Sequence, residues 1–337
     1  MVPPSFWWRE GSVAARLLAP LAAVYGAVAA RRLALPGKRA GVPVLCVGNL
    51  TLGGAGKTPT ALAVARMLIA EGARPFFLTR GYGGQLGGPI EVDPSRHTAS
   101  DVGDEPFLLA RLAPVTVARD RVAGAIAARE AGASVVVMDD GFQNPALAKD
   151  IALLVVDARR GIGNGKIFPA GPLRAPLDAQ LGRAQGLIVI GQGTGAAALM
   201  KAARARGLAM FAGTLEPDGA AISTLRGRKV LAFAGIGDPE KFFLTLAAAG
   251  IDAPVKRSFA DHHRYRAADA AALIDEAERA GLTLVTTEKD RVRMAGDAAL
   301  TVLSERVMTL PVTLRIEDDA RFRDFVRRVV PAKAETQ

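Results

Sequence analysis

The glycine-rich run TLGGAGKT at residues 51–58 constrains this chain more than any other feature. The apolar segment VPVLCVGNL before it predicts a buried strand, and ALAVARMLIAEG after it has helical spacing. A glycine-rich loop between a strand and a helix N-terminus presents backbone N–H groups to phosphate oxygens. The order strand, loop, helix therefore predicts a P-loop that binds a nucleoside triphosphate.

Individual loop positions have expected tasks. Lys57 is expected to reach the β- and γ-phosphates and Thr58 to ligate Mg²⁺, whereas Thr51 stands where the strict pattern has glycine. The alternative is a turn that only joins strand to helix. The residues predicted to hold the triphosphate are Thr51, Leu52, Gly53, Gly54, Ala55, Gly56, Lys57 and Thr58.

Strand-like and helix-like segments alternate after the loop, as far as GLIVIG at residues 186–191. This alternation predicts an α/β fold, with a P-loop NTPase-like parallel sheet and helices on both of its faces. A polar connector is expected near residues 216–227, before the alternation restarts with KVLAFAGIG. We therefore expect an N-terminal helical segment over 1–35, a P-loop domain over 36–222 and a second, smaller α/β domain over 223–337.

An acidic pair ends the strand SVVVMDD. Because ligands gather at the carboxyl ends of parallel strands, Asp139 and Asp140 are expected beside the P-loop, where they and Thr58 would hold Mg²⁺. The alternative is that the pair caps a turn with Gly141. In the GFQN that follows, Gln143 is placed to hydrogen-bond a phosphate or to orient a nucleophile.

Two further segments carry groups that can transfer protons. Asp104 and Glu105 open a helix, where a carboxylate can cap the helix or accept the proton of an alcohol during phosphoryl transfer. The segment FADHHRY places His262 and His263 at a strand exit, where a histidine can pair with a carboxylate or lie in a plain surface loop. The residues alone leave these alternatives open.

The chain is basic, with 43 Lys and Arg against 33 Asp and Glu and a net charge of +10. This balance favours an anionic partner. Nucleic acid is not expected, because aromatic residues make up only 5% of the chain and no nucleic-acid-binding module is recognisable. The single cysteine, Cys46, rules out an intramolecular disulfide and fits a reducing compartment.

The uncharged segment LLAPLAAVYGAVAA at residues 17–30 follows Arg16 and precedes Arg31. It is shorter than the roughly 20 residues that a spanning helix needs. Trp7 and Trp8 ahead of it, and arginines on both flanks, are typical of a segment that lies in the membrane interface. We predict a surface anchor. The alternatives are a secretory signal, which would separate the nucleotide site from ATP, and an ordinary core helix.

Taken together, GNLTLGGAGKTP, LTRGYGG, GDEP, DDGFQ, FPAGPLR, FAGIG, FADHH and TTEKD resemble the tetraacyldisaccharide 4′-kinases of lipid A biosynthesis. The resemblance runs from about residue 5 to residue 293, and threonine at position 51 is usual in that family. It implies a Gram-negative kinase on the cytoplasmic face of the inner membrane. With ATP and Mg²⁺, such an enzyme phosphorylates the 4′-hydroxyl of an acylated glucosamine disaccharide 1-phosphate. No obligate protein partner is expected.

The resemblance also implies roles for individual residues. Asp104 resembles the family's proposed general base, with His262 as its partner, and Lys57 completes the expected catalytic set. Expected substrate contacts are Arg80, Tyr82, Glu105, Arg121 and Gln143, with Arg119 close enough to Arg121 to leave that register open. The chain departs from many relatives at Asn144 and Ala175, so neither is given a role.

Two other classes of function remain open from the residues. A P-loop regulatory NTPase or partner-switching protein would consume ATP without a lipid acceptor. A nucleic-acid-binding ATPase is suggested only by the net charge.

Overall fold

The computed structural model describes residues 4–329. Its strands are Val44–Asn49 (β1), Pro75–Thr79 (β2), Ile90–Glu91 (β3), Val115–Val117 (β4), Val135–Asp139 (β5), Ile151–Asp157 (β6), Gly186–Ile190 (β7), Ala209–Pro217 (β8), Lys229–Ala234 (β9), Asp252–Ser258 (β10), Thr283–Thr286 (β11), Met308–Thr309 (β12) and Val312–Ile316 (β13). Its α-helices are Val13–Leu17 (α1), Ala19–Ala34 (α2), Lys57–Ala70 (α3), Ala99–Val102 (α4), Asp104–Ala110 (α5), Arg121–Glu130 (α6), Leu177–Leu181 (α7), Ala197–Ala205 (α8), Gly219–Leu225 (α9), Pro239–Ala248 (α10), Ala267–Ala280 (α11), Glu288–Met294 (α12), Thr301–Arg306 (α13) and Asp319–Arg327 (α14). Short 3₁₀ helices lie at Ser5–Trp8 (η1) and Ala298–Leu300 (η2).

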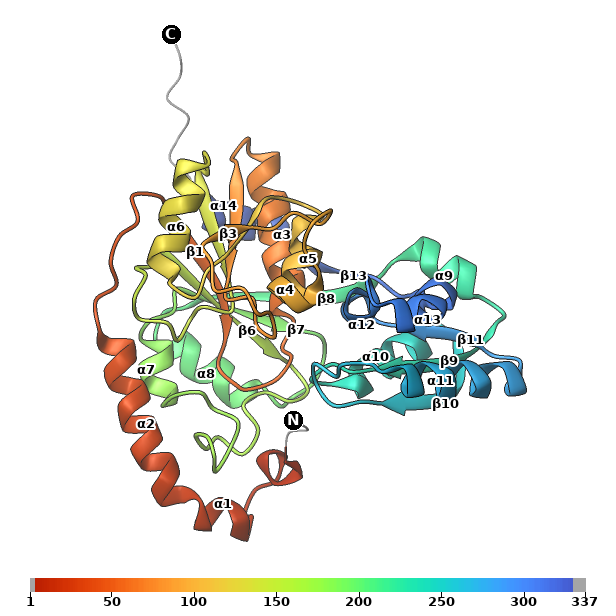
Figure 1. The fold of residues 1–337 in the computed structure, drawn as a ribbon. Coiled ribbons are helices and arrows are strands. Elements are labelled where there is room, and N and C mark those ends of the chain that lie inside the picture. The colour runs from red at the N-terminus through yellow and green to blue at the C-terminus, as the bar shows by residue number, and fades with distance from the viewer. Residues whose placement is uncertain (1–3, 330–337) are drawn as a thin grey trace.

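Within the described residues the strands form two sheets, one in each of two lobes (Figure 1). The larger sheet has nine strands in the order β13-β8-β7-β6-β1-β5-β2-β4-β3. Strand β1 lies in the middle and runs parallel to β5 and β6, and all three are buried along their length. Fully buried parallel strands need cover on both faces. The predicted parallel α/β sheet is confirmed for its inner strands, while the edge strands β13 and β3 pair antiparallel with their neighbours.

Helices cover both faces of the larger sheet. Val64 and Leu68 of α3 pack with Phe322 of α14 in the core on one face. Ala125 and Ala128 of α6 belong to the core on the other face. The predicted two-sided cover is therefore present, and it leaves the carboxyl ends of the strands free to carry loops.

The smaller lobe repeats this pattern around a four-stranded parallel sheet in the order β10-β9-β11-β12. Along β9, Leu231 and Phe233 belong to a core shared with α11 and α13, while Val230 and Ala232 belong to a core shared with α9 and α10. Alternate residues of a strand face opposite sides of its sheet, so β9 serves both cores. A second α/β unit is thus present.

The end of the chain differs from the expected division of domains. Strand β8 extends to Pro217 and α9 follows it, where a polar connector was expected near residues 216–227. Leu314 of β13 then pairs with Leu215 of β8, so residues 312–327 join the larger lobe although they were expected in the smaller domain. The chain returns to the larger sheet because these two segments, distant in sequence, pair as neighbouring strands. The boundary at residue 223 otherwise remains a prediction, and residues 1–3 and 330–337 of the expected domains lie outside the described range.

Helices α1 and α2 lie along the outside of the larger lobe (Figure 1). Ala22, Gly26 and Leu33 of α2 face inward and are buried. A Cβ at Gly26 would lie 2.7 Å from Cδ1 of Ile167, so α2 packs closely against this side chain. Between residues 4 and 329, no helix combines the length and the apolar character needed to cross a membrane.

Candidate functional site

The P-loop has a shape that depends on its glycines. Gly53 and Gly56 have φ angles of 104° and 95°, in the left-handed region that favours glycine. A Cβ at Gly56 would lie 2.7 Å from Cδ1 of Ile190. The side chain of Asn49 donates to the carbonyl oxygens of Thr51 at 2.7 Å and Gly53 at 3.2 Å. Helix α3 starts directly after this loop, so its free N–H groups face the phosphate site.

The acidic pair at the end of β5 lies beside the P-loop, as expected from the topology. The Thr58 hydroxyl donates to Oδ2 of Asp139 at 3.3 Å, and Nζ of Lys57 lies 3.4 Å from Oδ2 of Asp140. Asp140 has a φ of 52°, which is uncommon for a residue with a side chain. Strand β5 and the P-loop therefore bring these four predicted residues together.

The two carboxylates differ in their ionisation. Burial and the nearby charge of Asp140 raise the pKa of Asp139 to about 7. Burial would also raise the pKa of Asp140, but the charges of Lys57 and Arg174 outweigh it and hold that pKa well below its usual value. Oδ1 of Asp139 is buried without a hydrogen-bond partner. An unpartnered carboxylate oxygen beside a hydroxyl and a second carboxylate suits Mg²⁺, which prefers oxygen ligands.

Arg174 is a site residue to which the sequence analysis gave no role. Its backbone N–H donates to the carbonyl of Leu50 at 2.9 Å, and Leu52 donates to the carbonyl of Pro172 at 2.8 Å, so residues 172–174 run alongside the start of the P-loop. NH1 of Arg174 donates to Oδ1 of Asp140 at 2.8 Å. The motif FPAGPLR, which ends in this arginine, was the available signal.

Gln143 lies in the same region and is engaged within the protein. Its Nε2 donates to the carbonyl of Asn49 at 2.8 Å and to Oε1 of Gln180 at 3.0 Å. Its Oε1 accepts from NH1 of Arg174 at 3.3 Å. These contacts connect the P-loop strand to Arg174, and the expected contact of Gln143 with substrate remains a prediction.

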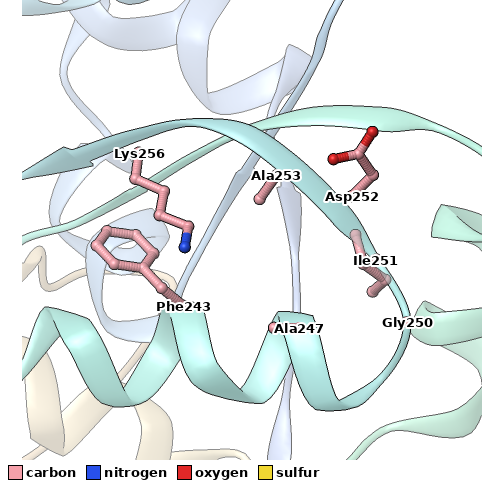
Figure 2. Close-up of a pocket in the computed structure, with 7 residues that line it drawn as sticks. All are labelled: Phe243, Ala247, Gly250, Ile251, Asp252, Ala253 and Lys256. Atoms are coloured by element: carbon pink, nitrogen blue, oxygen red, sulfur yellow. The ribbon is translucent and has the colours of Figure 1, made fainter.

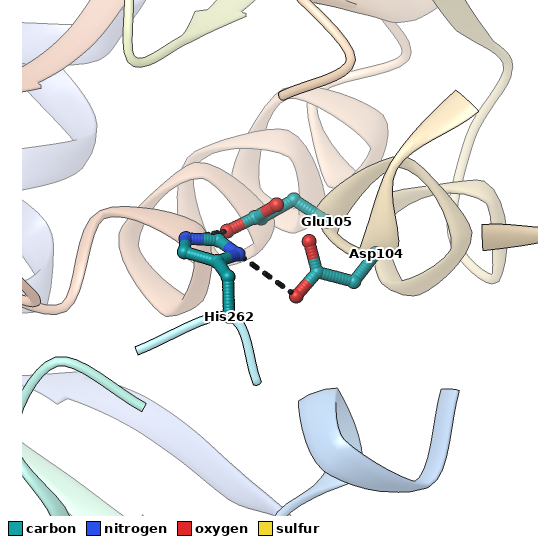
Figure 3. Close-up of side chains that lie close together, drawn as sticks. All are labelled: Asp104, Glu105 and His262. Atoms are coloured by element: carbon teal, nitrogen blue, oxygen red, sulfur yellow. Dashed lines mark ion pairs between the residues drawn. The ribbon is translucent and has the colours of Figure 1, made fainter. Parts of the chain in front are cut away.

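The structure also brings together Asp104, Glu105 and His262 (Figure 3). Asp104 begins α5 in the larger lobe and is only 4% exposed, whereas His262 lies in the loop after β10 in the smaller lobe. Nδ1 of His262 lies 3.4 Å from Oδ2 of Asp104, and its Nε2 lies 3.9 Å from Oε1 of Glu105. The predicted pair of acid and histidine therefore forms across the two lobes.

Helix α12 supplies two cations to the same carboxylates. Nζ of Lys289 lies 2.9 Å from Oε1 of Glu105, and Nε of Arg293 donates to Oδ2 of Asp104 at 2.7 Å. Although Asp104, Glu105 and His262 are close enough to share a metal ion, these cations already balance the two negative charges. The arrangement favours proton transfer over metal binding. The motif TTEKD was noted in the sequence, but Lys289 and Arg293 were given no roles.

These contacts set the ionisation of the cluster. Burial would raise the pKa of Asp104, but hydrogen bonds from Glu105 and His262 and the charges of Arg293 and Lys289 hold it well below its usual value. Burial would lower the pKa of His262, but the hydrogen bond and charges of the two carboxylates raise it. Burial raises the pKa of Glu105, and the neighbouring Asp104 adds to this. Of the two carboxyl groups, Asp104 is thus the one that is held in its ionised form.

The remaining predicted substrate residues are Tyr82, Arg80 and Arg121. Tyr82 is 62% exposed and its ring centroid lies 4.8 Å from that of His262. Arg121 is 3% exposed, and its Nε is buried without a partner. Burial and the charge of exposed Arg80 lower the pKa of Arg121 to about 10. Arg119 and Arg121 each donate to a backbone carbonyl, Arg119 to that of Gln85 at 3.3 Å and Arg121 to that of Ala118. A buried cation with a free donor suits an anionic ligand.

The smaller lobe also touches the P-loop directly. A Cβ on Gly237 would lie 2.7 Å from the backbone nitrogen of Gly54, so the two backbones approach closely. Next to this contact, the buried carboxylate of Asp238 pairs with Arg159 at 2.5 Å and Arg160 at 2.6 Å, both from the larger lobe. These contacts hold the smaller lobe against the P-loop.

A shallow pocket lies elsewhere, between α10 and β10 of the smaller lobe (Figure 2). Phe243, Asp252 and Lys256 line it, and Nζ of Lys256 lies 5.8 Å from the ring centroid of Phe243. None of the predicted site residues is among its lining residues. The pocket is therefore separate from the site built around the P-loop.

Comparisons with known proteins show the family of this chain. The family model described as "Tetraacyldisaccharide-1-P 4′-kinase" matches residues 14–331. A protein of Methylobacterium sp. (strain 4-46), named tetraacyldisaccharide 4′-kinase, is 60% identical over 92% of this chain and 94% of its own length. A protein of the same name from Rhodopseudomonas palustris (strain BisB18) is 56% identical over 97% of this chain and 95% of its own length.

A solved structure also matches this chain. The crystal structure of LpxK from Aquifex aeolicus in complex with ATP is 26% identical and superposes with a TM-score of 0.72. The match covers 94% of this chain and 99% of that chain. From the family match and these relatives, we conclude that the chain belongs to the tetraacyldisaccharide-1-P 4′-kinase family.

Proposed function

We propose that this chain transfers the γ-phosphate of ATP to the 4′-hydroxyl of a tetraacyldisaccharide 1-phosphate, a step of lipid A biosynthesis. The observation that carries the proposal is the approach of His262 to Asp104 across the two lobes, beside a P-loop. The names of the relatives give the acceptor. A P-loop alone would bind nucleotide, whereas the ion-paired acid at its edge adds a group that can accept the proton of an alcohol.

The nucleotide would be held by residues 51–58. The backbone N–H groups of this loop and Lys57 would neutralise the β- and γ-phosphate oxygens. Thr58, Asp139 and Asp140 would hold Mg²⁺, which when bound supplies further neutralisation of the charge on the transferred group. Arg174, fixed against the P-loop by Asp140, adds a cation on the same side.

The acceptor would be activated by Asp104. In the transfer a bond forms between the 4′-oxygen and the γ-phosphorus, the bond from that phosphorus to ADP breaks, and Asp104 accepts the hydroxyl proton. His262 fixes the carboxylate from the other lobe. We propose that Arg121, Arg80 and Tyr82 contact the phosphate or sugar of the lipid, since Arg121 is a buried cation with a free donor.

The outward face of α1 and α2 supports work at a membrane surface. Leu17, Leu21, Val24 and Val28 recur at helical spacing and are 54–76% exposed. Such an apolar stripe is costly in water and suits the boundary between headgroups and acyl chains. We propose peripheral attachment to the cytoplasmic face of the inner membrane, where the stripe would raise the effective concentration of a lipid acceptor.

A hollow at the start of α6 supports an acceptor with apolar chains. It lies between the end of α2 and the start of α6 and is lined by Leu35, Pro36, Lys38, Asp120, Val122, Ala123, Ile126, Pro145 and Ala146. Val122 directly follows Arg121 in α6, so the hollow opens near the buried cation. We propose that it takes part of an acyl chain while Arg121 takes a polar group.

The direct test is transfer of labelled phosphate. Purified protein is incubated with γ-labelled ATP, Mg²⁺ and a tetraacyldisaccharide 1-phosphate in detergent micelles, and the lipid is separated and counted. Label on the lipid, lost in Asp104→Ala, supports the proposal. ATP consumption that is independent of the lipid would instead favour a regulatory NTPase.

A further inference from the structure

The carboxylate of Asp290 in α12 organises the face that the smaller lobe turns toward the site. Asp290 is fully buried. Its Oδ1 accepts from the backbone N–H of Gly235 at 3.0 Å, from the Tyr265 hydroxyl at 3.0 Å and from NH1 of Arg293 at 2.8 Å. Its Oδ2 accepts from the Thr287 hydroxyl at 2.6 Å. A buried carboxylate with this many donors is a rigid anchor.

The partners of Asp290 belong to segments that reach the site. The segment at Gly235 leads to Gly237, which touches the P-loop. Tyr265 ends the loop that carries His262, and α12 itself carries Lys289. One carboxylate therefore fixes the three parts of the smaller lobe that enter the site.

Arg293 connects Asp290 in the smaller lobe to Asp104 in the larger lobe. Its side chain is 7% exposed, and NH1 donates to the carbonyl of Gly235 at 2.6 Å as well as to Asp290. Nε donates to Oδ2 of Asp104 at 2.7 Å. NH2 lies 2.5 Å from the same oxygen and forms an ion pair with it, but not a hydrogen bond. The planar guanidinium reaches partners in both lobes at once, which the point charge of a lysine cannot reproduce.

The contacts on Asp104 are unequal between its two oxygens. Arg293 and His262 both approach Oδ2. A general base needs one oxygen free for the incoming proton and a carboxylate plane that does not rotate. Resting on the proposed function, we infer that Arg293 is a positioning residue that, anchored by Asp290, holds Oδ2 of Asp104 so that Oδ1 faces the acceptor hydroxyl.

The positive charge of Arg293 should have a measurable effect on the pKa of Asp104. The charged and titratable groups that face Asp104 are Glu105, His262, Lys289 and Arg293. The charges of Arg293 and Lys289 and the hydrogen bonds of the other two hold the pKa of Asp104 below its usual value, so loss of Arg293 raises this pKa. Because the base must be ionised to work, activity is then lost at a higher pH as the solution is acidified.

The experiment compares Arg293→Gln and Arg293→Lys with Arg111→Gln. Arg111 is the matched control, because its NH1 pairs with Glu288 at 2.7 Å and also joins the region of α5 to α12 without touching Asp104. The profiles are measured with Mg²⁺ saturating at every pH, so that protonation of Asp139 does not set the acid limb. For Arg293→Gln we expect kcat to fall by about 10²-fold, KM for ATP to change by less than about 3-fold, and the acid limb of the kcat profile to move up by about one pH unit. Arg293→Lys should recover part of kcat, and Arg111→Gln should match the wild type.

A second measurement does not need the acceptor. Titration of His262 by NMR should show a higher pKa in Arg293→Lys, because the carboxylates then have one less well-placed cation competing with the histidine. An unchanged His262 titration, an unmoved acid limb, or an equal loss in Arg111→Gln overturns the inference. Wild-type protein that labels no lipid contradicts the proposed function instead, and the NMR comparison still decides whether Arg293 holds Asp104.

Discussion

NH1 of Arg174 donates a hydrogen bond to Oδ1 of Asp140 at 2.8 Å, while Nζ of Lys57 lies 3.4 Å from Oδ2 of the same carboxylate. One acid therefore aligns two cations beside the phosphate site. We predict that Arg174→Gln lowers kcat by about 10²- to 10³-fold, as expected for loss of one group that stabilises transferred charge. Steady-state kinetics with the lipid acceptor measure this. Arg183→Gln, which removes an exposed arginine bonded to the carbonyl of Ala34, should leave kcat within about 2-fold.

Replacement of Asp104 tests the proposed base. Asp104→Ala should lower kcat by about 10²- to 10⁴-fold, the range for loss of a general base, with little change in ATP affinity. Nucleotide titration by calorimetry and kinetics on the same preparation separate the two effects. Wild-type turnover in the variant would remove Asp104 from the mechanism.

The raised pKa of Asp139 would make the proposed Mg²⁺ binding sensitive to pH. Burial and Asp140 raise this pKa to about 7, and a protonated carboxyl group is a poor ligand for Mg²⁺. As the pH falls below 7, the Mg²⁺ concentration for half-maximal activity should rise by up to about tenfold per pH unit. In Asp139→Asn, the Mg²⁺ concentration for half-maximal activity should be high at every pH. An identical Mg²⁺ requirement at pH 6 and pH 8 in the wild type would contradict the assignment of Asp139 as a ligand.

The apolar stripe predicts membrane attachment. Replacing Leu21 and Val28 together by glutamate puts two charges where the helix would meet acyl chains, so flotation with anionic vesicles should fall by at least about tenfold. Activity on a lipid acceptor in short-chain detergent should be nearly unchanged. Val302→Glu is the matched control, because Val302 is 58% exposed but lies on α13 in the smaller lobe. Equal flotation of all three proteins would exclude the stripe as the anchor.

Local sequence was enough to predict the centre of the larger lobe. The apolar run before Thr51 and the helical spacing after Thr58 gave β1 and α3, and the acids at the end of β5 follow from the rule that parallel strands end at one edge. The pairing of β13 with β8 could not be read in this way. Its alternation is short, and the register depends on packing against a strand about a hundred residues earlier.

In the site, too, contacts between residues close in sequence could be predicted and contacts between distant residues could not. Lys57 and Thr58 have fixed spacing within a motif, so chemistry and sequence agree locally. Arg293 and Asp104 lie 189 residues apart, and no spacing rule joins them. Their contact results from the folding of α12 around Asp290 and from the close approach of the two lobes, neither of which has a periodic signature in the chain.

The antiparallel pair of β8 and β13 gives the smaller lobe a single stem. Pro217 faces Val312, and the N–H of Asp218 donates to the carbonyl of Pro311 at 2.9 Å, so the polypeptide leaves and re-enters the large sheet at one place. Topologically the small lobe is an insertion in a hairpin. Joining residues 217 and 312 by a tight turn would excise it and spare the triphosphate cradle. The same deletion would remove both His262 and Arg293, so we expect the remaining lobe to bind ATP without transferring its phosphate.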